Sequence, residues 1–334
     1  MKISYSFIIP VYNRPDEIDE LLYSMVAMEY DKDYEIVIVE DGSSETSEEV
    51  VKKYQDQLNI SYYQKINTGP GDSRNYGMRK AVGTYFLILD SDVILPVDYL
   101  ASVDTFLSKR FVHCFGGPDD AHKSFTKLQK AISYSMTSYL TTGGIRGKKN
   151  TTNTFQPRSF NMGISKEAFE ASEGFGNIHP GEDPDLTIRL WELGYQTALI
   201  PEAIVFHKRR ISWSKFYIQV HKFGLVRPIL NLWHPATAKI TYWFPTLFLI
   251  YVIFSMVTAF FGYWFFMAIL MLYLFIILIG ATISYQSISI GIYAIVAVLI
   301  QFYGYGSGFL KSYYYIHWLK KVPEQQFKHL FFSK

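Results

Sequence analysis

A long apolar stretch near the C-terminus divides this chain of 334 residues into two chemically different parts. After Lys239 it contains no Asp, Glu, Lys or Arg up to about Gly280, whereas most of the charged residues precede Lys239. Soluble core elements do not run that far without charge, and about 20 apolar residues are enough for one helix to cross a bilayer. We therefore expect a membrane-bound part that follows a polar N-terminal domain.

The membrane part contains three apolar blocks, at about residues 241–260, 263–282 and 288–306. The first two are long enough to cross a bilayer as a tight hairpin, and the third is rich in Gly and Tyr toward its end. Basic residues precede the first block and follow the last, so the positive-inside rule favours an even number of crossings. We expect two spans and a re-entrant or interfacial third segment, with three spans as the alternative.

The run SWSKFYIQVHKFGLVRP, just before these blocks, mixes aromatic and basic residues at helical spacing. Such a helix can lie in the bilayer interface with its aromatic rings at headgroup depth. Lys208, Arg209 and Arg210, which precede it, either hold a lipid diphosphate or flank the membrane on the cytoplasmic side. The sequence thus predicts a polar domain over residues 1–210, interfacial helices over 211–239, transmembrane helices over 240–310 and a basic tail over 311–334.

The N-terminal domain alternates strand-like runs with helical patterns. The apolar runs YSFIIPVY, YEIVIVE, ISYYQK and YFLIL are typical of strands, and helical patterns occur at about residues 15–26, 45–57 and 72–81. This alternation predicts an α/β fold with a doubly wound, mostly parallel sheet. Ligands of such sheets bind beyond the carboxyl ends of the strands. The polar residues at these ends are Asn13, Glu40, Asp41, Asp90 and Asp92.

Composition narrows the class of partner. The formal net charge of +2 is too small to suggest nucleic acid, and no basic run in the N-terminal half is interleaved with aromatic residues. The single cysteine, Cys114, excludes an internal disulfide and a cysteine metal cluster, which favours a reducing compartment. The N-terminus shows no signal-peptide pattern, so we expect the first domain to remain in the cytoplasm.

Asp90 and Asp92 follow the strand-like run YFLIL. In an extended chain residues i and i+2 point the same way, so the two carboxylates can address one site. Two hard carboxylate donors, completed by waters and phosphates, suit Mg²⁺ or Mn²⁺ better than zinc. A metal in that position would bridge a diphosphate to the protein and neutralise a leaving phosphate.

Glu182, Asp183 and Asp185 form a second acidic cluster, just before a helical pattern that includes Leu186 and Leu190. Like charges raise one another's pKa and a nearby cation lowers it, a setting suited to base catalysis. Acidic residues are also common at helix N-termini, where they complement the helix dipole. The residues by themselves favour this structural interpretation.

Five segments of the chain resemble glycosyltransferase family 2, whose members are inverting enzymes of the A-type fold. The segments are FIIPVYNRPDEIDELLYSM, EIVIVEDGSS, GPGDSRNYGMRKAVGTYFLILDSD, FNMGISKEAFEASEGFG and GEDPDLTIRLWELGYQTALIPEAIVFH. Their order and approximate spacing resemble those of the family over about Ser6 to Arg227. The resemblance implies that residues 1–210 form a cytoplasmic catalytic domain with a Rossmann-like A-type fold.

The resemblance also implies which residues hold the donor. It places Pro10, Tyr12 and Asn13 in the loop around the nucleotide. Asp41 would contact the base or the ribose, and Arg74 would lie near the nucleotide or its phosphates. A carboxylate can accept from a uracil N–H or a ribose hydroxyl, and a guanidinium can pair with phosphate oxygens. The alternative for Arg74 is a salt bridge along its own helix.

The same resemblance implies the metal and the base. Asp90 and Asp92 would form the metal-binding motif for Mn²⁺ or Mg²⁺, with His207 near the metal or the diphosphate. Asp183 would take a proton from the acceptor hydroxyl, and Glu182 is the second candidate for this role. Attack on the anomeric carbon from the face opposite the nucleotide would invert its configuration.

The implied function is transfer of a hexose from a nucleotide sugar, preferably a UDP-sugar, to a hydroxyl of a lipid-linked glycan. The reaction would take place at the cytoplasmic face of the plasma (inner) membrane, during polysaccharide biosynthesis for the cell envelope. Processive synthases of the family carry Gln-x-x-Arg-Trp where this chain has QVHKF, which argues against a polymer channel. The alternatives are a polyprenyl-phosphate glycosyltransferase and a catalytically silent membrane scaffold or nucleotide-sugar binding subunit.

Overall fold

The structure is a computed structural model that describes residues 3–120, 125–142, 155–207 and 212–332. The chain forms two compact units. The sheet unit comprises Met1–His122, Lys149–Lys208 and Phe331–Lys334, and the helical unit comprises Lys123–Lys148 and Arg209–Leu330. The two units therefore do not meet at a single boundary near residue 210. The internal segment Lys123–Lys148 groups with the helical unit, and Phe331–Lys334 groups with the sheet unit.

The sheet unit is built on a seven-stranded sheet with the strand order β3-β2-β1-β4-β8-β6-β9. Strands β1 to β4 run parallel to one another, and β8 is antiparallel to both β4 and β6. The predicted α/β fold with a mostly parallel sheet is confirmed. The strands are β1 (Tyr5–Val11), β2 (Tyr34–Asp41), β3 (Ile60–Lys65), β4 (Tyr85–Leu89), β6 (Cys114–Gly116), β8 (Asn161–Ser165) and β9 (Thr197–Leu199).

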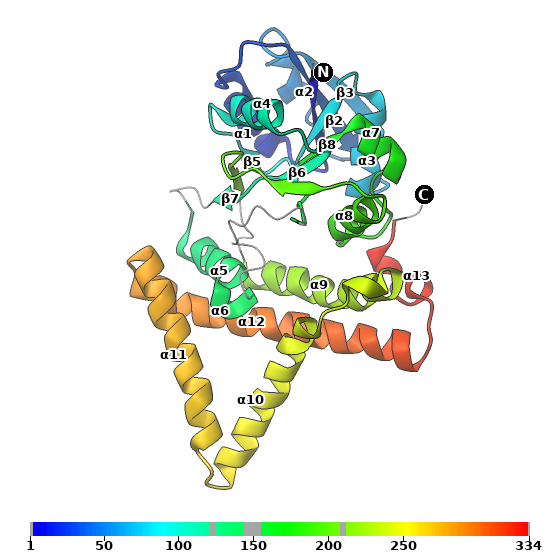
Figure 1. Cartoon of the computed structure of the whole chain (residues 1–334). Coiled ribbons are helices and arrows are strands. Elements are labelled where there is room, and N and C mark those ends of the chain that lie inside the picture. The colour runs from blue at the N-terminus through cyan, green and yellow to red at the C-terminus, as the bar shows by residue number, and fades with distance from the viewer. Residues whose placement is uncertain (1–2, 121–124, 143–154, 208–211, 333–334) are drawn as a thin grey trace. The chain divides into compact units, whose positions relative to one another are not determined.

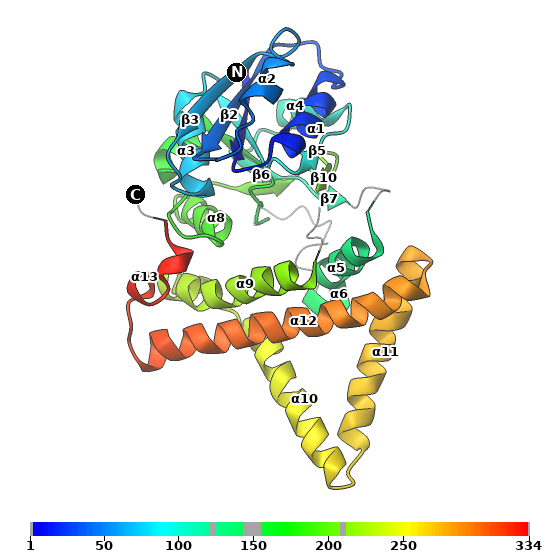
Figure 2. The ribbon, with the colours of Figure 1, turned by 180° about the vertical axis from the view of Figure 1, so that it is seen from behind.

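Helices cover both faces of this sheet (Figures 1 and 2). Alternate strand residues point to opposite faces, so in β1 Phe7 and Ile9 join one core while Ile8 joins the other. The first core also contains residues of α1 (Pro15–Val26), α2 (Glu48–Lys52) and α4 (Tyr99–Lys109). The second contains residues of α3 (Pro70–Lys80), α7 (Lys166–Ser172) and α8 (Glu182–Glu192).

Helix α2 is shorter than the helical pattern at 45–57 predicts. It spans Glu48–Lys52, and the chain continues in turns to Gln57. Val51 is its one fully buried side chain, so little apolar surface stabilises a longer helix. The neighbouring α1 buries four apolar side chains and extends over the predicted 15–26.

A second, three-stranded sheet has the order β5-β10-β7, from β5 (Val93–Ile94), β7 (Asp119–Asp120) and β10 (Val205–His207). In the register of this sheet His207 is opposite Val93. The backbone of His207 therefore lies beside the residue that follows Asp92 in the chain.

The helical unit contains three helices that are long and apolar enough to cross a membrane. These candidate spans are Ile240–Phe260, Phe265–Tyr285 and Ile288–Trp318, judged by length and composition. Figures 1 and 2 show α10 and α11 as a hairpin that projects away from α9 and α12, which run side by side. The helices of the unit are α5 (Lys127–Thr137), α6 (Tyr139–Thr142), α9 (Trp213–Trp233), α10 (Phe244–Phe260), α11 (Phe265–Tyr285), α12 (Ile288–Tyr313) and α13 (Pro323–Gln326).

Helices α9 and α12 pack closely through glycine. A Cβ added at Gly224 of α9 would collide with the carbonyl oxygen of Tyr305 on α12. Added at Gly308 of α12, it would collide with the carbonyl oxygen of His221 on α9. Small residues of this kind let two helix backbones approach in apolar surroundings.

Replacing Gly224 by Ala is expected to lower the Tm of the detergent-solubilised protein. Alanine favours a helix over glycine by about 1 kcal/mol, but forcing α9 and α12 apart costs about 1–3 kcal/mol and outweighs that gain. The matched control is Ile218→Ala on the same helix, because Ile218 is exposed. A higher Tm for Gly224→Ala would show that the two helices are not closely packed there.

Charge is distributed very unequally between the two units. The helical unit contains 15 Lys and Arg and a single acidic residue, Glu324, for a formal charge of +14. The sheet unit contains the other 17 basic residues and 29 acidic residues, for a formal charge of −12. Residues 240–310, which include the hairpin, carry no Asp, Glu, Lys or Arg. The small net charge of +2 therefore conceals a strongly basic helical unit.

Candidate active site

The candidate site of the sheet unit is centred on Arg74, in α3. Its Nη2 donates to Asp90 Oδ1 at 2.7 Å, just beyond β4, and its Nη1 donates to Glu182 Oε1 at 3.2 Å, at the start of α8. The side chain is 4% exposed. Arg74 therefore pairs with carboxylates of two other elements, and the interpretation as a salt bridge along its own helix is wrong.

The surroundings of Arg74 fix its charge. Burial alone would lower the pKa of its guanidinium, but Asp90, Glu182 and Asp183 raise it above the ordinary value. The buried Nε has no hydrogen-bond partner among the residues that the structure describes. Buried donors are normally satisfied, and a guanidinium N–H suits a phosphate oxygen. Arg74 thus has a donor available for an anionic ligand.

Asp183 and Glu182 are adjacent but have opposite pKa shifts. Burial and the charge of Glu182 raise the pKa of Asp183. Its Oδ2 accepts from the Ser159 backbone N–H at 3.2 Å, while its buried Oδ1 has no partner in the described part of the chain. A carboxylate with a raised pKa and an available oxygen has the properties of a general base.

Glu182 is held as an anion. Burial would raise its pKa, but His179 and Arg74 lower it to about 2. Its Oε1 is shared by Arg74 and by His179, whose Nδ1 lies 2.9 Å away. A carboxylate this acidic is a poor proton acceptor near pH 7, so among the two predicted catalytic residues the geometry favours Asp183.

Asp185 faces a different partner. Its Oδ2 accepts from Arg189 Nε at 3.0 Å and from Arg189 Nη2 at 2.9 Å, one turn further along α8. Both charge-assisted bonds go to the same oxygen and hold the Asp185 carboxylate against its own helix. Asp185 is therefore a useful control carboxylate for the site.

The predicted nucleotide loop is held together by its own side chains. Asn13 follows β1 with a positive φ of 55°, a conformation that Asn tolerates better than most residues. Its Oδ1 accepts from the backbone N–H groups of Ser44 at 2.8 Å and Glu45 at 3.1 Å, in the loop after β2. Pro10 lies within β1, and Tyr12 is 52% exposed. Asn13 thus joins two loops at the carboxyl edge of the sheet, and Tyr12 is available to a ligand.

Asp41, at the end of β2, is 4% exposed and engaged on both oxygens. Oδ1 accepts from Lys65 Nζ at 2.7 Å and from the Thr68 N–H at 3.0 Å, and Oδ2 accepts from the Gly69 N–H at 2.9 Å. These bonds hold the loop that leads into α3. Contact of Asp41 with the base or the ribose remains a prediction.

The predicted metal ligands lie at the same edge of the sheet. Asp92 Oδ2 pairs with Arg14 Nη1 at 3.1 Å, as Asp90 pairs with Arg74. His207 lies in β10, and its side chain is outside the described residues, as are Lys208, Arg209 and Arg210. Within the described residues no group of three or more His, Cys, Asp or Glu side chains could hold a metal ion. The two aspartates are hard oxygen donors that fit Mg²⁺ or Mn²⁺ if a diphosphate and water complete the shell.

Three charged residues near the site were missed by the sequence interpretation. Lys65 pairs with Asp41, Arg14 with Asp92, and His179 with Glu182. Lys65 is the last residue of β3, so the rule that ligands bind at the carboxyl ends of strands could have found it. Arg14 and His179 carried no comparable signal. Asp92, the partner of Arg14, is 78 residues away in the sequence, and His179 itself lies in an irregular turn before α8.

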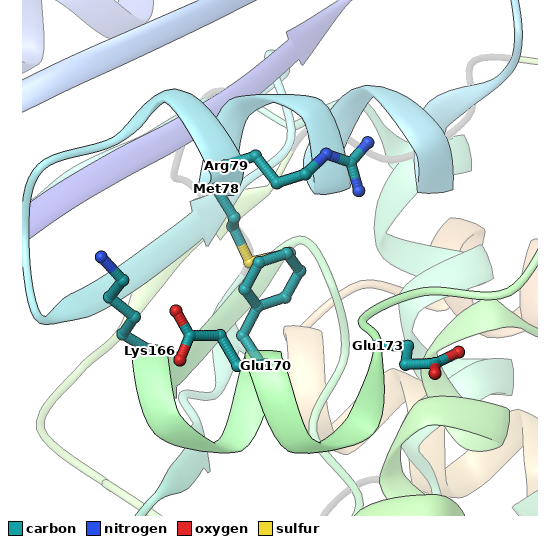
Figure 3. A pocket seen from close by; sticks show the side chains of 6 residues that line it. Met78, Arg79, Lys166, Glu170 and Glu173 are labelled. Carbon is teal, nitrogen blue, oxygen red and sulfur yellow. The ribbon is translucent and has the colours of Figure 1, made fainter.

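A separate pocket lies between the end of α3 and α7 (Figure 3). It is lined by Met78, Arg79, Lys166, Phe169, Glu170 and Glu173. Basic and acidic side chains are mixed in it, and none of the predicted site residues takes part. This pocket is not the candidate active site.

The family model described as Glycosyl transferase family 2 matches residues 6–171. This range includes Arg74, Asp90 and Asp92 but ends before Glu182 and Asp183. The matched range therefore contains the residues predicted to hold the nucleotide and the metal and excludes the two predicted catalytic carboxylates, and by itself it assigns a role to none of them.

Two of the curated relatives are named as poly(ribitol-phosphate) glycosyltransferases. Poly(ribitol-phosphate) beta-N-acetylglucosaminyltransferase TarS of Staphylococcus aureus is 32% identical over 110 residues, which are 32% of this chain and 19% of that protein. Poly(ribitol-phosphate) beta-glucosyltransferase of Bacillus spizizenii is 40% identical over 106 residues, which are 30% of this chain and 16% of that protein. This chain thus matches less than a fifth of the length of either relative.

Two solved structures share the fold. S. aureus TarS 1–349 in complex with UDP-GlcNAc has a TM-score of 0.50 and 19% sequence identity, covering 67% of both chains. Mannosyltransferase PcManGT from Pyrobaculum calidifontis, in complex with GDP-Man and Mn²⁺, has a TM-score of 0.52 and 16% identity. This second likeness covers 67% of this chain and 63% of PcManGT. At these identities the two likenesses show the fold alone.

Proposed function

We propose that this chain is an inverting hexosyltransferase that uses a nucleotide-sugar donor, because residues 6–171 match the family model described as Glycosyl transferase family 2. The observation that carries the proposal is Asp183, with its raised pKa and available oxygen, in the same charge cluster as Arg74 and Asp90. A base can activate an acceptor hydroxyl, and a phosphate-binding cation and a metal-binding carboxylate can help to stabilise a leaving diphosphate.

In the proposed reaction Asp183 accepts the proton of an acceptor hydroxyl. The hydroxyl oxygen forms a bond to the anomeric carbon while the bond from that carbon to the diphosphate oxygen breaks on the opposite face. The nucleoside diphosphate leaves with the electron pair, and the Nε–H of Arg74 stabilises its negative charge. Mg²⁺ or Mn²⁺ held by Asp90 and Asp92 would supply further charge neutralisation at the diphosphate.

The proposed donor is a nucleoside-diphosphate sugar, with UDP as the favoured nucleotide. The crystallised TarS complex contains UDP-GlcNAc and the PcManGT complex contains GDP-Man and Mn²⁺, so both neighbours bind a donor of this class. The exposed ring of Tyr12 and the loop held by Asp41 form the proposed nucleotide side. The sugar itself is left to experiment.

The experiment that tests the activity is a donor screen with the purified full chain. We expect at least one nucleoside-diphosphate sugar to bind and to be converted to nucleoside diphosphate when Mn²⁺ is present. A chain that binds a donor tightly but releases no nucleoside diphosphate, even with membrane lipids as acceptors, would be the scaffold or binding subunit instead.

We propose that the acceptor is a lipid-linked glycan at the cytoplasmic face of the plasma membrane. The support is the helical unit, which combines a charge-free hairpin with a formal charge of +14. Basic residues are retained on the cytoplasmic side and attract anionic lipids, which favours this orientation. The same basic character would suit a polyprenyl phosphate, so that acceptor is the competing candidate. A phosphate acceptor is already ionised and needs no base, so dependence on Asp183 separates the two.

We further propose that α10 and α11 are the two spans and that α12 lies in the interface beside α9. The 21 residues from Ile240 to Phe260 extend about 31 Å as a helix, close to the thickness of the hydrocarbon core. The turn between α10 and α11 carries aromatic rings, which are enriched at membrane interfaces. These exposed residues are Phe260, Phe261, Tyr263, Trp264 and Phe265.

Cysteine labelling is expected to give different results at the two ends of the hairpin. The native Cys114 is buried and should not react in the folded protein. Single Lys215→Cys and Lys321→Cys variants should react with an impermeant maleimide from the cytoplasmic side, and Tyr263→Cys from the opposite side. Labelling of the Lys321→Cys variant from the side opposite the Lys215→Cys variant would establish three spans.

A further inference from the structure

The last described residues of the chain form a short strap on the loop that precedes α8. This strap consists of Phe331 and Phe332. Phe331 makes an antiparallel bridge with Ile178, and the Phe332 N–H donates to the Asn177 carbonyl oxygen at 3.0 Å. All of these residues belong to the sheet unit, although more than 150 residues of sequence separate the two segments.

The ring of Phe332 lies against two parts of the candidate site. Its centroid is 6.2 Å from that of His179, with an interplanar angle of 53°. A Cβ added at Gly69 would collide with the same ring, so only glycine leaves room for it. Gly69 also has a φ of 92° and donates its N–H to Asp41. The strap thus contacts the loop held by Asp41 and the turn that leads to the proposed base.

From His179 a continuous chain of polar contacts leads into the site. Its Nδ1 is 2.9 Å from Glu182 Oε1, which accepts from Arg74 Nη1 at 3.2 Å. Arg74 in turn donates to Asp90 at 2.7 Å. Asn75 holds the other end of the same loop, with Nδ2 donating to the Phe175 carbonyl and Oδ1 accepting the Phe175 N–H, both at 2.8 Å. The loop between Phe175 and Glu182 is therefore fixed at both ends and covered in the middle by the strap.

We propose that Phe332 is a positioning residue for catalysis, which holds His179 against Glu182 and so keeps Arg74 and Asp183 in their working arrangement. This inference rests on the proposed transferase function. The side chain of His179 is 40% exposed, so it depends on the Phe332 ring for lateral support. Without the ring His179 can turn toward water, and Glu182 then loses one of the two side chains that Oε1 contacts.

The test compares Phe332→Ala with wild type and with Phe332→Tyr, which keeps the ring. We expect Phe332→Ala to lower kcat about 10- to 100-fold, with donor Kd changed less than about threefold, and Phe332→Tyr to restore most of the rate. Phe111→Ala is the matched control, because Phe111 is a half-exposed phenylalanine that packs edge-on against His113, outside the site. It should leave kcat unchanged.

A second measurement does not depend on activity. Hydrogen–deuterium exchange of residues 175–186 should be faster in Phe332→Ala than in wild type and in Phe111→Ala. If Phe332→Ala does not fold, Phe332→Leu replaces it. Unchanged exchange together with wild-type kcat would overturn the strap proposal, even if the transferase activity is real. Faster exchange in a chain that turns over no donor would support the strap and contradict the proposed function.

Discussion

Replacing Asp183 by Asn is expected to lower kcat by about 10²- to 10⁴-fold, which corresponds to about 3–5 kcal/mol of activation free energy. Asparagine keeps the shape and can still accept from the Ser159 N–H, but it cannot take a proton at neutral pH. The acceptor hydroxyl would then attack without assistance. Donor Kd should change little, because the proposed donor contacts lie at Arg74, Asp90 and Asp92, so the loss should appear in kcat.

Asp185→Asn is the matched control for this variant. It removes a carboxylate two residues away that is already paired with Arg189, so kcat should stay within a few-fold of wild type. A large loss in Asp185→Asn and none in Asp183→Asn would show that the wrong carboxylate has been assigned. Wild-type kcat in both would identify an acceptor that needs no base, such as a phosphate.

The same base predicts the pH dependence of the wild type. The pKa of Asp183 is raised by burial and by Glu182. A base acts only when deprotonated, so activity is present above this pKa and is lost as the pH falls through it. The acid limb of the kcat profile should therefore lie above the ordinary pKa of an aspartate, which is about 3.9, and should be absent from the residual activity of Asp183→Asn.

Removal of divalent metal is expected to abolish transfer, and Mn²⁺ or Mg²⁺ should restore it. In the absence of a metal, Asp90 pairs with Arg74 and Asp92 pairs with Arg14. A donor diphosphate would then approach two carboxylates with no cation to bridge the negative charges. Asp92→Ala should weaken donor binding at least about 10-fold in Mn²⁺ and change it much less in excess chelator. Calorimetric titration of the donor in the two conditions measures the difference.

Asp56→Ala controls for the loss of an acidic residue from the sheet unit, because Asp56 is exposed in the turn after α2. Its donor Kd should match wild type in both conditions. Full activity of the wild type in excess chelator would remove the metal from the mechanism. It would leave Arg74 as the main group that stabilises the leaving diphosphate.

The strands and the donor side of the site were predictable because they follow from local pattern. A buried strand can be a short apolar run, as in β4, which begins and ends at the residues of the run YFLIL. Asp41 and Asp90 were found because they end or follow such runs, where parallel sheets bind ligands. The short α2 differs from its helical pattern because tertiary packing, and not periodicity, decides which apolar residues are buried.

The pairings within the site could not be predicted, because they join distant segments. Arg74 and Glu182 are 108 residues apart, and Arg14 and Asp92 are 78 residues apart. Periodicity carries no information about such contacts. For the same reason the sequence could not show that Glu182 is committed to Arg74 and His179, which is what separates it from Asp183. The strap of Phe331 and Phe332 was equally invisible, since the C-terminal residues read only as a basic tail.

Transfer of labelled sugar to extracted membrane lipids by the purified full chain tests the central claim most directly. The donor is the nucleoside-diphosphate sugar that the screen identifies, supplied with Mn²⁺, and both the lipid-bound label and the released nucleoside diphosphate are measured. We predict equal amounts of the two products for wild type, and a rate at least about 100-fold lower for Asp183→Asn with unchanged donor Kd. A wild-type chain that binds the donor yet forms neither product, or an Asp183→Asn variant that forms both at the wild-type rate, would contradict it.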